Sequence, residues 1–265
     1  MPNHLMSKIY LEGDPKRIQE LLEYVKYDDG DIGSLDCNKV IPMPDSLHLT
    51  SGTIEWGSIS AYLSKVNPTN MNFPVDNKPS EELFNKICDM LNDARLLRHL
   101  YTNMSYQNIV DMVNARYKDM SPDEFIDLGA KYVSNLLKYG ATSWYDWCYD
   151  NWGSKWGAYD AEPFANNTMT FKTANAPIIP VISKLGSMFP DIKITYKWAN
   201  EDWGRNTGVI ELFNSSHESF MPADYSCTAW ELFQECWNLP KEELEDIQLE
   251  LKNVDVENVE VENIV

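Results

Sequence analysis

Hydrophobic and polar residues alternate with a period of two in several short stretches of this chain. That period is typical of β-strands with one buried face, because successive side chains point to opposite sides of a sheet. The strongest example runs from Ile192 to Trp198. A weaker extended piece at 38–44 is broken by two prolines, which cannot donate to a sheet ladder. The expected strands span residues 5–12, 38–44, 168–172, 192–198 and 209–213.

Apolar residues at helical spacing predict two helices between these strands. The first, at 15–25, follows Asp14-Pro15, where the aspartate can cap a helix and the proline suits its first position. The second covers 177–188. When the middle of the chain, residues 46–141, is left out, the predicted elements follow one another as strand, helix, strand, strand, helix, strand. This order predicts the α+β class, with a ferredoxin-like antiparallel sheet (βαββαβ plus an extra C-terminal strand) and a helical insertion.

The middle of the chain is predicted to form that helical insertion. Residues 121–124 (Ser-Pro-Asp-Glu) make a capping box, and Gly140 supplies a helix stop. Ser80 and Ser105 can cap two earlier helices, whereas 45–79 reads as loop with a short helix near its middle. The predicted organisation is a discontinuous ferredoxin-like domain at 1–45 and 142–213, a mainly helical insertion at 46–141, a C-terminal helical extension at 214–252 and a flexible acidic tail at 253–265.

The chain is strongly acidic, with a formal net charge of −19 from 22 basic and 41 acidic residues. Residues 241–265 alone hold nine carboxylates against two lysines. Such a charge disfavours contacts with nucleic-acid phosphates, which need clustered Lys and Arg, and it favours basic partners. The sequence shows neither a secretory signal nor an apolar run long enough to span a membrane, so we expect a cytoplasmic protein.

The sequence offers no recognisable catalytic or metal-binding motif. Its five cysteines are scattered, which indicates free thiols, and its four histidines form no paired ligand motif. A Gly-rich phosphate loop, a nucleophile elbow and a His-Glu-x-x-His zinc motif are all missing from it. We therefore predict no catalytic, cofactor-binding or metal-binding residues.

Tryptophans concentrate between residues 144 and 156, where four of the nine in the chain fall within thirteen residues. Such a cluster indicates either a packed core or a recognition surface, of the protein hot-spot or base-stacking type. Lys155 lies between two of these tryptophans and can make a cation–π contact or stand as a rim lysine. The candidate interaction surface comprises Trp144, Trp147, Trp152, Lys155, Trp156, Trp198, Asp202 and Trp203.

Several short elements together give the chain a family resemblance. They are Met1-Pro2-Asn3-His4, Ile41-Pro42-Met43-Pro44, Asn151-Trp152-Gly153-Ser154-Lys155-Trp156 and Phe171-Lys172-Thr173-Ala174. With these elements the chain resembles the YubB-like family of phage and plasmid proteins, over roughly residues 1–45 and 142–213. The resemblance implies a ferredoxin-like domain and a mobile-element origin, and it implies no catalytic residues. One departure is Asn175, where that family tends to have a tryptophan.

The leading functional hypothesis is a non-enzymatic accessory protein of a phage or plasmid, acting in the cytoplasm of a bacterial host cell. It would bind a host protein with a basic surface through acidic and aromatic residues. In one form of this hypothesis, the protein inhibits a host defence or nucleic-acid-processing system. A first alternative is a small-molecule or nucleotide enzyme with a site between the sheet and the insertion. A second is a single-stranded RNA-binding module, which a predominantly acidic open sheet face would exclude.

Overall fold

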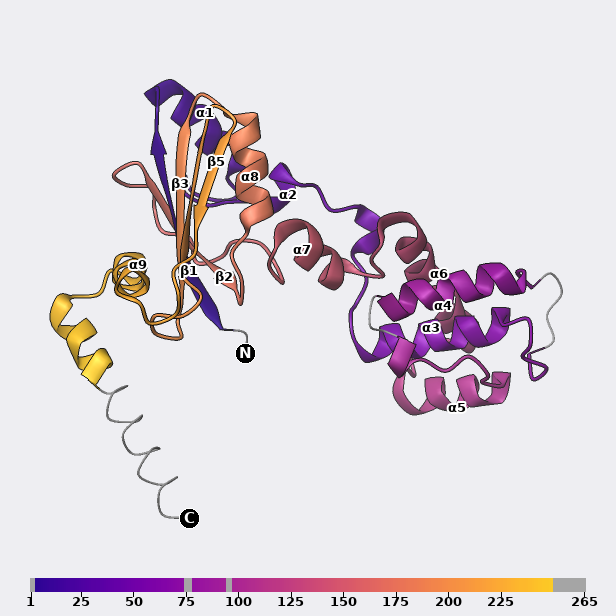
Figure 1. Ribbon diagram of the computed structural model, residues 1–265. Coiled ribbons are helices and arrows are strands. Elements are labelled where there is room, and N and C mark those ends of the chain that lie inside the picture. The colour runs from indigo at the N-terminus through magenta and orange to yellow at the C-terminus, as the bar shows by residue number, and fades with distance from the viewer. Residues whose placement is uncertain (1–2, 74–77, 94–96, 250–265) are drawn as a thin grey trace, which may run out of the picture. The chain divides into compact units, whose positions relative to one another are not determined.

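The computed structural model of the chain describes residues 3–73, 78–93 and 97–249 (Figure 1). The chain divides into two compact units. Unit 1 comprises Met1–Pro42 and Asn151–Val265, and unit 2 comprises Met43–Asp150. The predicted acidic tail at 253–265 lies outside the described residues.

Unit 1 is built on a five-stranded antiparallel sheet in the order β2-β1-β3-β4-β5. Its strands are β1 (His4–Glu12), β2 (Thr168–Ala174), β3 (Lys193–Asn200), β4 (Gly208–Phe213) and β5 (Ser216–Phe220). β2 and β3 flank β1 and are joined by a helix, which is the split βαβ arrangement of ferredoxin-like folds. The sheet and its helices confirm the predicted α+β, ferredoxin-like class.

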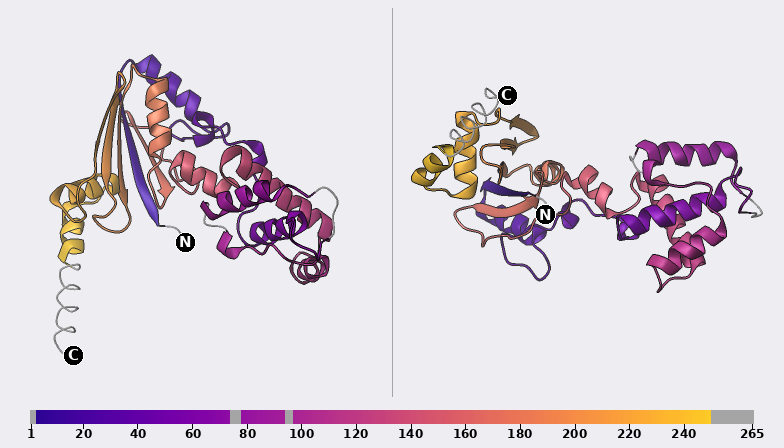
Figure 2. Two further views of the ribbon diagram at one scale, coloured as in Figure 1. Left: turned by 45° about the vertical axis from the view of Figure 1, so that its right-hand side comes forward. Right: turned by 90° about the horizontal axis from the view of Figure 1, so that it is seen from below.

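The two faces of the sheet carry different helices, as Figures 1 and 2 show. Helices α1 (Pro15–Val25) and α8 (Ile179–Met188) cover one face, where Ile9 pairs with the buried Tyr196. Helix α9 (Cys227–Trp237) packs on the opposite face, against Ala199. The main core of unit 1 therefore lies beneath α1 and α8, and a smaller apolar cluster lies beneath α9.

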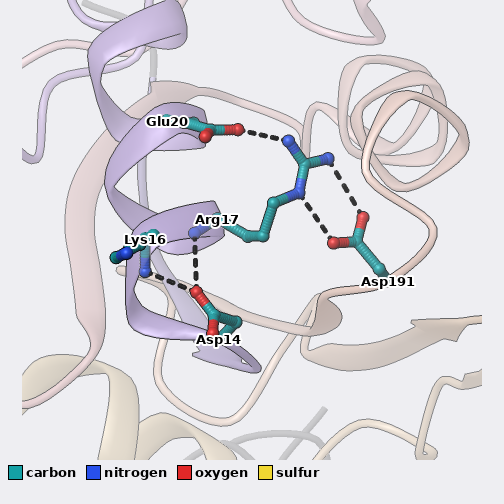
Figure 3. A network of polar contacts seen from close by, with 5 residues as sticks. All are labelled: Asp14, Lys16, Arg17, Glu20 and Asp191. Atoms are coloured by element: carbon teal, nitrogen blue, oxygen red, sulfur yellow. Dashed lines mark hydrogen bonds and ion pairs between the residues drawn. The ribbon is translucent and has the colours of Figure 1, made fainter.

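The start of α1 is fixed by the polar network in Figure 3. Asp14 caps the helix by accepting from the backbone N–H groups of Lys16 (2.8 Å) and Arg17 (3.4 Å). The Arg17 guanidinium donates to both carboxylate oxygens of Asp191, from Nε at 2.8 Å and from Nη2 at 3.1 Å, and also to Glu20. Asp191 lies between the end of α8 and the start of β3. The two hydrogen bonds from Arg17 therefore link α1 to the α8–β3 connection.

Two details of the predicted strand order are wrong. Residues 38–44 form no sheet strand, because Asp36 caps the short helix α2 (Cys37–Val40) through the Asn38 N–H at 2.9 Å. A 3-10 turn, η1 (Asp45–Leu47), follows the prolines. At the other end, residues 216–220 fall within the expected helical extension, but they form β5, whose side chains are all exposed. The sheet thus lacks the expected strand at 38–44 and gains β5 beside β4.

Unit 2 is helical. Its elements are α3 (Thr53–Val66), α4 (Glu81–Asp93), η2 (Leu97–His99), α5 (Tyr106–Arg116), α6 (Pro122–Tyr139) and the first part of α7 (Trp144–Trp152), within which the unit boundary falls. The Ser121–Glu124 capping box and the left-handed Gly140 stop are both present. The short helix predicted near the middle of 45–79 is present as α3, which is longer than expected because it begins at Thr53. A Cβ on Gly129 would lie 1.9 Å from the Ser58 carbonyl oxygen, so α3 and α6 pack backbone to backbone there.

Candidate functional site

Three of the predicted surface tryptophans are buried. Trp198 is only 1% exposed, and its ring lies on Gly208 of the neighbouring strand. Trp152 donates its indole N–H to the Ile41 carbonyl oxygen at 2.9 Å. Trp147 is also buried. These three side chains therefore belong to the interior and offer little surface to a partner.

The other members of the tryptophan-rich segment are half-buried. Trp144 makes an edge contact with Tyr145 and lies in unit 2. In unit 1, the Lys155 ammonium lies 4.7 Å from the centre of the Trp156 ring, which is the cation–π contact, one of the two alternatives considered for this residue. Of the tryptophans that keep some exposure in this segment, Trp144 therefore belongs to unit 2 and Trp156 to unit 1.

The hairpin loop between β3 and β4 presents the remaining two predicted residues. Trp203 is 39% exposed, and the exposed Asp202 accepts a hydrogen bond from the Asn3 side chain at 2.8 Å. The loop is clamped to the segment before α9, because the Tyr225 N–H donates to the Gly204 carbonyl oxygen at 2.9 Å. Gly204 has a φ of +69°, and a Cβ there would lie 3.1 Å from the Trp230 ring. The clamp holds Trp203 in place while leaving it open to solvent.

Helix α9 supplies the other side of this region. Ser226 caps it through the Ala229 N–H at 3.2 Å, and Asn238 ends it in the left-handed conformation. Phe233 is buried beneath α9, and Trp237 donates its indole N–H to the Ala199 carbonyl oxygen at 3.2 Å. The aromatic spacing of α9 is visible in the sequence, where it indicates only packing. Its position beside the hairpin loop depends on contacts between residues far apart in the chain.

Two hollows lie at this loop, and α9 lines the smaller one. One has a volume of about 510 Å³ and is lined by Glu201, Asp202, Trp203, Arg205 and Tyr225. The second has a volume of about 230 Å³ and is lined by Glu201, Trp203, Phe233, Trp237, Leu239, Glu243 and Ile247. Glu201 and Trp203 line both, so the two hollows lie side by side. We call these lining residues the acidic-aromatic groove.

The charge of the groove is negative. Its lining contains three carboxylates, and Arg205 is the one basic residue among the described residues that line it. The Arg205 guanidinium already lies over the Tyr225 ring, 5.0 Å from its centre. A lining of aromatic and apolar side chains together with carboxylates can hold a basic, partly apolar segment, since cations stack on aromatic rings and pair with carboxylates.

The face of the sheet beneath α9 carries a separate polar network. Lys197 donates to Glu235 at 2.7 and 2.8 Å, Tyr10 donates to the same carboxylate at 2.7 Å, and Lys8 donates to the Glu235 carbonyl oxygen at 2.6 Å. Although burial acts to raise it, the pKa of Glu235 is lowered by these hydrogen bonds and by the lysine charges. This face is therefore mixed in charge, and α9 covers part of it.

Unit 2 has a hollow of its own, of about 560 Å³, at the end of α6 and the start of α7. Asp93, Asp146 and Asp150 are among its lining residues. Burial, together with the charges of Glu55 and Asp150, raises the pKa of Asp146 to about 6. Within the described ranges, no group of three or more His, Cys, Asp or Glu side chains is arranged to hold a metal ion. The same residues include no helix that is long and apolar enough to cross a membrane.

Comparisons with known proteins support the fold and leave function open. Residues 151–240 match the family described as the ferredoxin-like domain in Api92-like proteins. This range runs from the start of the second segment of unit 1 through α9, so it reaches beyond the region of the YubB-like resemblance.

Among solved structures, the chain shows a weak similarity to a protein api92 from Yersinia pseudotuberculosis. That crystal structure is 11% identical, with 84% of this chain and 99% of that chain covered and a TM-score of 0.38. Such a degree of similarity is too low to establish a shared function. No curated protein matches the chain.

Proposed function

We propose that this protein is a non-enzymatic accessory protein that binds another protein through the acidic-aromatic groove of unit 1. The single observation that carries the proposal is the exposed Trp203, which is held by a clamped loop beside three carboxylates and the apolar side of α9. Exposed aromatic residues next to an apolar hollow are typical of protein-binding hot spots. The carboxylates around the groove complement a partner with a basic surface.

The same proposal includes a host protein as the partner and a phage or plasmid as the source of the chain. The support is the sequence resemblance to the YubB-like family, whose members are carried by such elements. A host defence or nucleic-acid-processing protein suits the charge of the groove, because proteins that handle nucleic acids present basic surfaces.

The RNA-binding alternative has less support. Four lysines (Lys8, Lys172, Lys193 and Lys197) lie on the sheet face beneath α9, as the strand register shows. However, Lys8 and Lys197 are engaged by α9, and Lys193 lies between Glu12 at 3.4 Å and Glu211 at 3.6 Å. The carboxylates beside Lys193 and Lys197 offset the charges of these two lysines, which lowers the attraction of this face for a phosphate backbone.

The test is an affinity capture from bacterial lysate with tagged protein, at low and high salt, followed by mass spectrometry. The baits are the wild type, the double variant Glu201→Gln/Trp203→Ala, and Glu218→Gln, which removes an exposed carboxylate on β5. We expect a protein that wild type and Glu218→Gln capture, that salt releases, and that the double variant loses. Capture that is equal for all three baits would contradict the proposal.

A further inference from the structure

We propose that the acidic-aromatic groove binds a segment in which an arginine stands next to a bulky apolar residue. The inference rests on the proposed function, and it adds the chemistry of the segment that the partner would insert. It follows from the different character of the two hollows that meet at Glu201 and Trp203.

The smaller hollow fits an apolar side chain. Its walls are Phe233, Trp237, Leu239 and Ile247, and its volume is about 230 Å³. A hollow of this size and lining can take a single bulky apolar side chain of a protein partner, and burial of that side chain would supply the apolar part of the binding energy.

The two residues that line both hollows can bind a cation. Trp203 is 39% exposed, and Glu201 adds a carboxylate to both linings. Arginine is favoured over lysine, because its planar guanidinium stacks on aromatic rings and binds carboxylates with two parallel hydrogen bonds. The chain already contains one such stacked pair in this groove, Arg205 over Tyr225, which is 45% exposed.

The larger hollow extends the preference for positive charge. Asp202 and Glu201 line it together with the Arg205–Tyr225 pair. An anionic ligand would meet these carboxylates and Glu243 on entry, which disfavours phosphates and nucleic acids. An adjacent arginine of the segment would instead find a carboxylate partner, so we expect alternating arginine and apolar residues to bind best.

The experiment measures fluorescence anisotropy of a short fluorescein-labelled peptide that alternates arginine with leucine, titrated with the full chain. Three matched peptides replace the leucines by serine, the arginines by lysine, or the arginines by glutamate. A single-stranded oligonucleotide serves as the anionic probe. Each is measured at about 0.15 M and about 0.5 M salt, because screening shortens the reach of exposed charges over that range.

The protein variants separate the groove from the general acidity of the chain. Glu201→Gln/Glu243→Gln removes two groove carboxylates, and Trp203→Ala removes the exposed ring. Glu218→Gln removes a carboxylate outside the groove as the matched control. Circular dichroism and urea unfolding confirm that each variant is folded before it is titrated.

We expect the arginine–leucine peptide to bind, the double variant and Trp203→Ala each to weaken it about tenfold, and Glu218→Gln to weaken it less than about twofold. The serine and glutamate peptides should bind at least about tenfold more weakly, and the lysine peptide should fall between. Equal losses for Glu218→Gln and the double variant, equal binding of the leucine and serine peptides, or preferred binding of the oligonucleotide would each overturn the inference.

Failure of this inference can be distinguished from failure of the proposed function. If the peptides do not discriminate but capture from lysate still depends on Glu201 and Trp203, the inference fails and the groove binds a protein of different chemistry. If capture is also independent of both residues, the proposed function fails together with the inference.

Discussion

Trp198 and Trp203 lie five positions apart in the sequence, but Trp198 is buried and Trp203 is exposed. Trp198 is on the sheet face that α1 and α8 cover, and its ring fits against Gly208, where a Cβ would lie 2.2 Å from the ring. Trp203 follows the end of β3, in a loop whose backbone is clamped to Tyr225. Strand register buries the first ring and loop geometry keeps the second one exposed. The comparison shows that the burial of a tryptophan in this protein depends on the strand or loop that carries it. A dense run of tryptophans in the sequence therefore predicts an interaction surface poorly.

The comparison indicates a packing role for Trp198, whereas Trp203 is the residue to which the proposed function assigns binding. The indole N–H of Trp198 has no hydrogen-bond partner among the described residues, so its contribution comes from packing. Trp203 shares its groove with residues of α9, and it is 39% exposed, whereas Trp198 is 1% exposed. Substitutions at and around the two rings can therefore separate folding from recognition.

The largest effect is expected for Trp198→Ala. Loss of the fully buried ring leaves a cavity beneath the helices, and comparable substitutions cost about 3–5 kcal/mol of unfolding free energy. Urea unfolding of the variant and of the wild type measures the difference. A loss below about 1 kcal/mol would show that Trp198 is not the packed centre of this face.

Gly208→Ala should have the next largest effect. The new methyl group would overlap the Trp198 ring, and overpacking of this kind costs about 1–3 kcal/mol. The control is Gly13→Ala, where the methyl group would make only ordinary contacts, at 3.4 Å from the Asp191 carbonyl oxygen and 3.5 Å or more from Ile192. Thermal unfolding should show a clear loss for Gly208→Ala and a much smaller change for the control, and equal changes would contradict the contact between Gly208 and Trp198.

Glu235→Gln tests how α9, and with it one side of the groove, is held on the sheet. The change weakens the hydrogen bonds from Lys197 and Tyr10, and we expect a loss of about 1 kcal/mol at neutral pH for this partly exposed pair. Because the pKa of Glu235 is lowered in the folded state, this stabilisation is present above the ordinary glutamate pKa and is lost as the pH falls through the folded value.

The pH dependence of unfolding provides the check on Glu235. The difference in unfolding free energy between wild type and Glu235→Gln should shrink as the pH falls below the ordinary glutamate pKa. A difference that stays constant down to acidic pH would show that the carboxylate charge does not hold α9.

The smallest effect on stability is expected for Trp203→Ala, at most about 0.5 kcal/mol, because the ring is partly solvated. The same variant should lose the salt-sensitive partner in the capture experiment. A large loss of stability would place Trp203 with Trp198 as a structural residue and would remove the contrast between them.

Much of the fold could be predicted from the sequence, because local patterns determine it. The alternation before Trp198 forms β3, and the capping box at Ser121 begins α6. The strand predicted at 38–44 is wrong, because the cap from Asp36 favours a helical turn over an extended strand. The strand at 216–220 escapes prediction because all its side chains are exposed and it shows no apolar alternation.

The candidate site could be predicted only in part. Asp202 and Trp203 are among the predicted residues, since a polar hairpin connection that carries a tryptophan is visible in the sequence. Trp237 and Glu243 are not, because they join the site through the packing of α9 on Ala199, at the far end of β3. Contacts between distant elements of this kind leave no local pattern.

The most direct test of the groove is hydrogen exchange of the full chain, measured with and without the captured partner. Binding in the groove predicts slower exchange at 201–207 and 225–247 and no change at 43–150. Protection that falls within 43–150, including the first part of α7 with Trp144 and Trp147, and spares the hairpin loop would contradict the account.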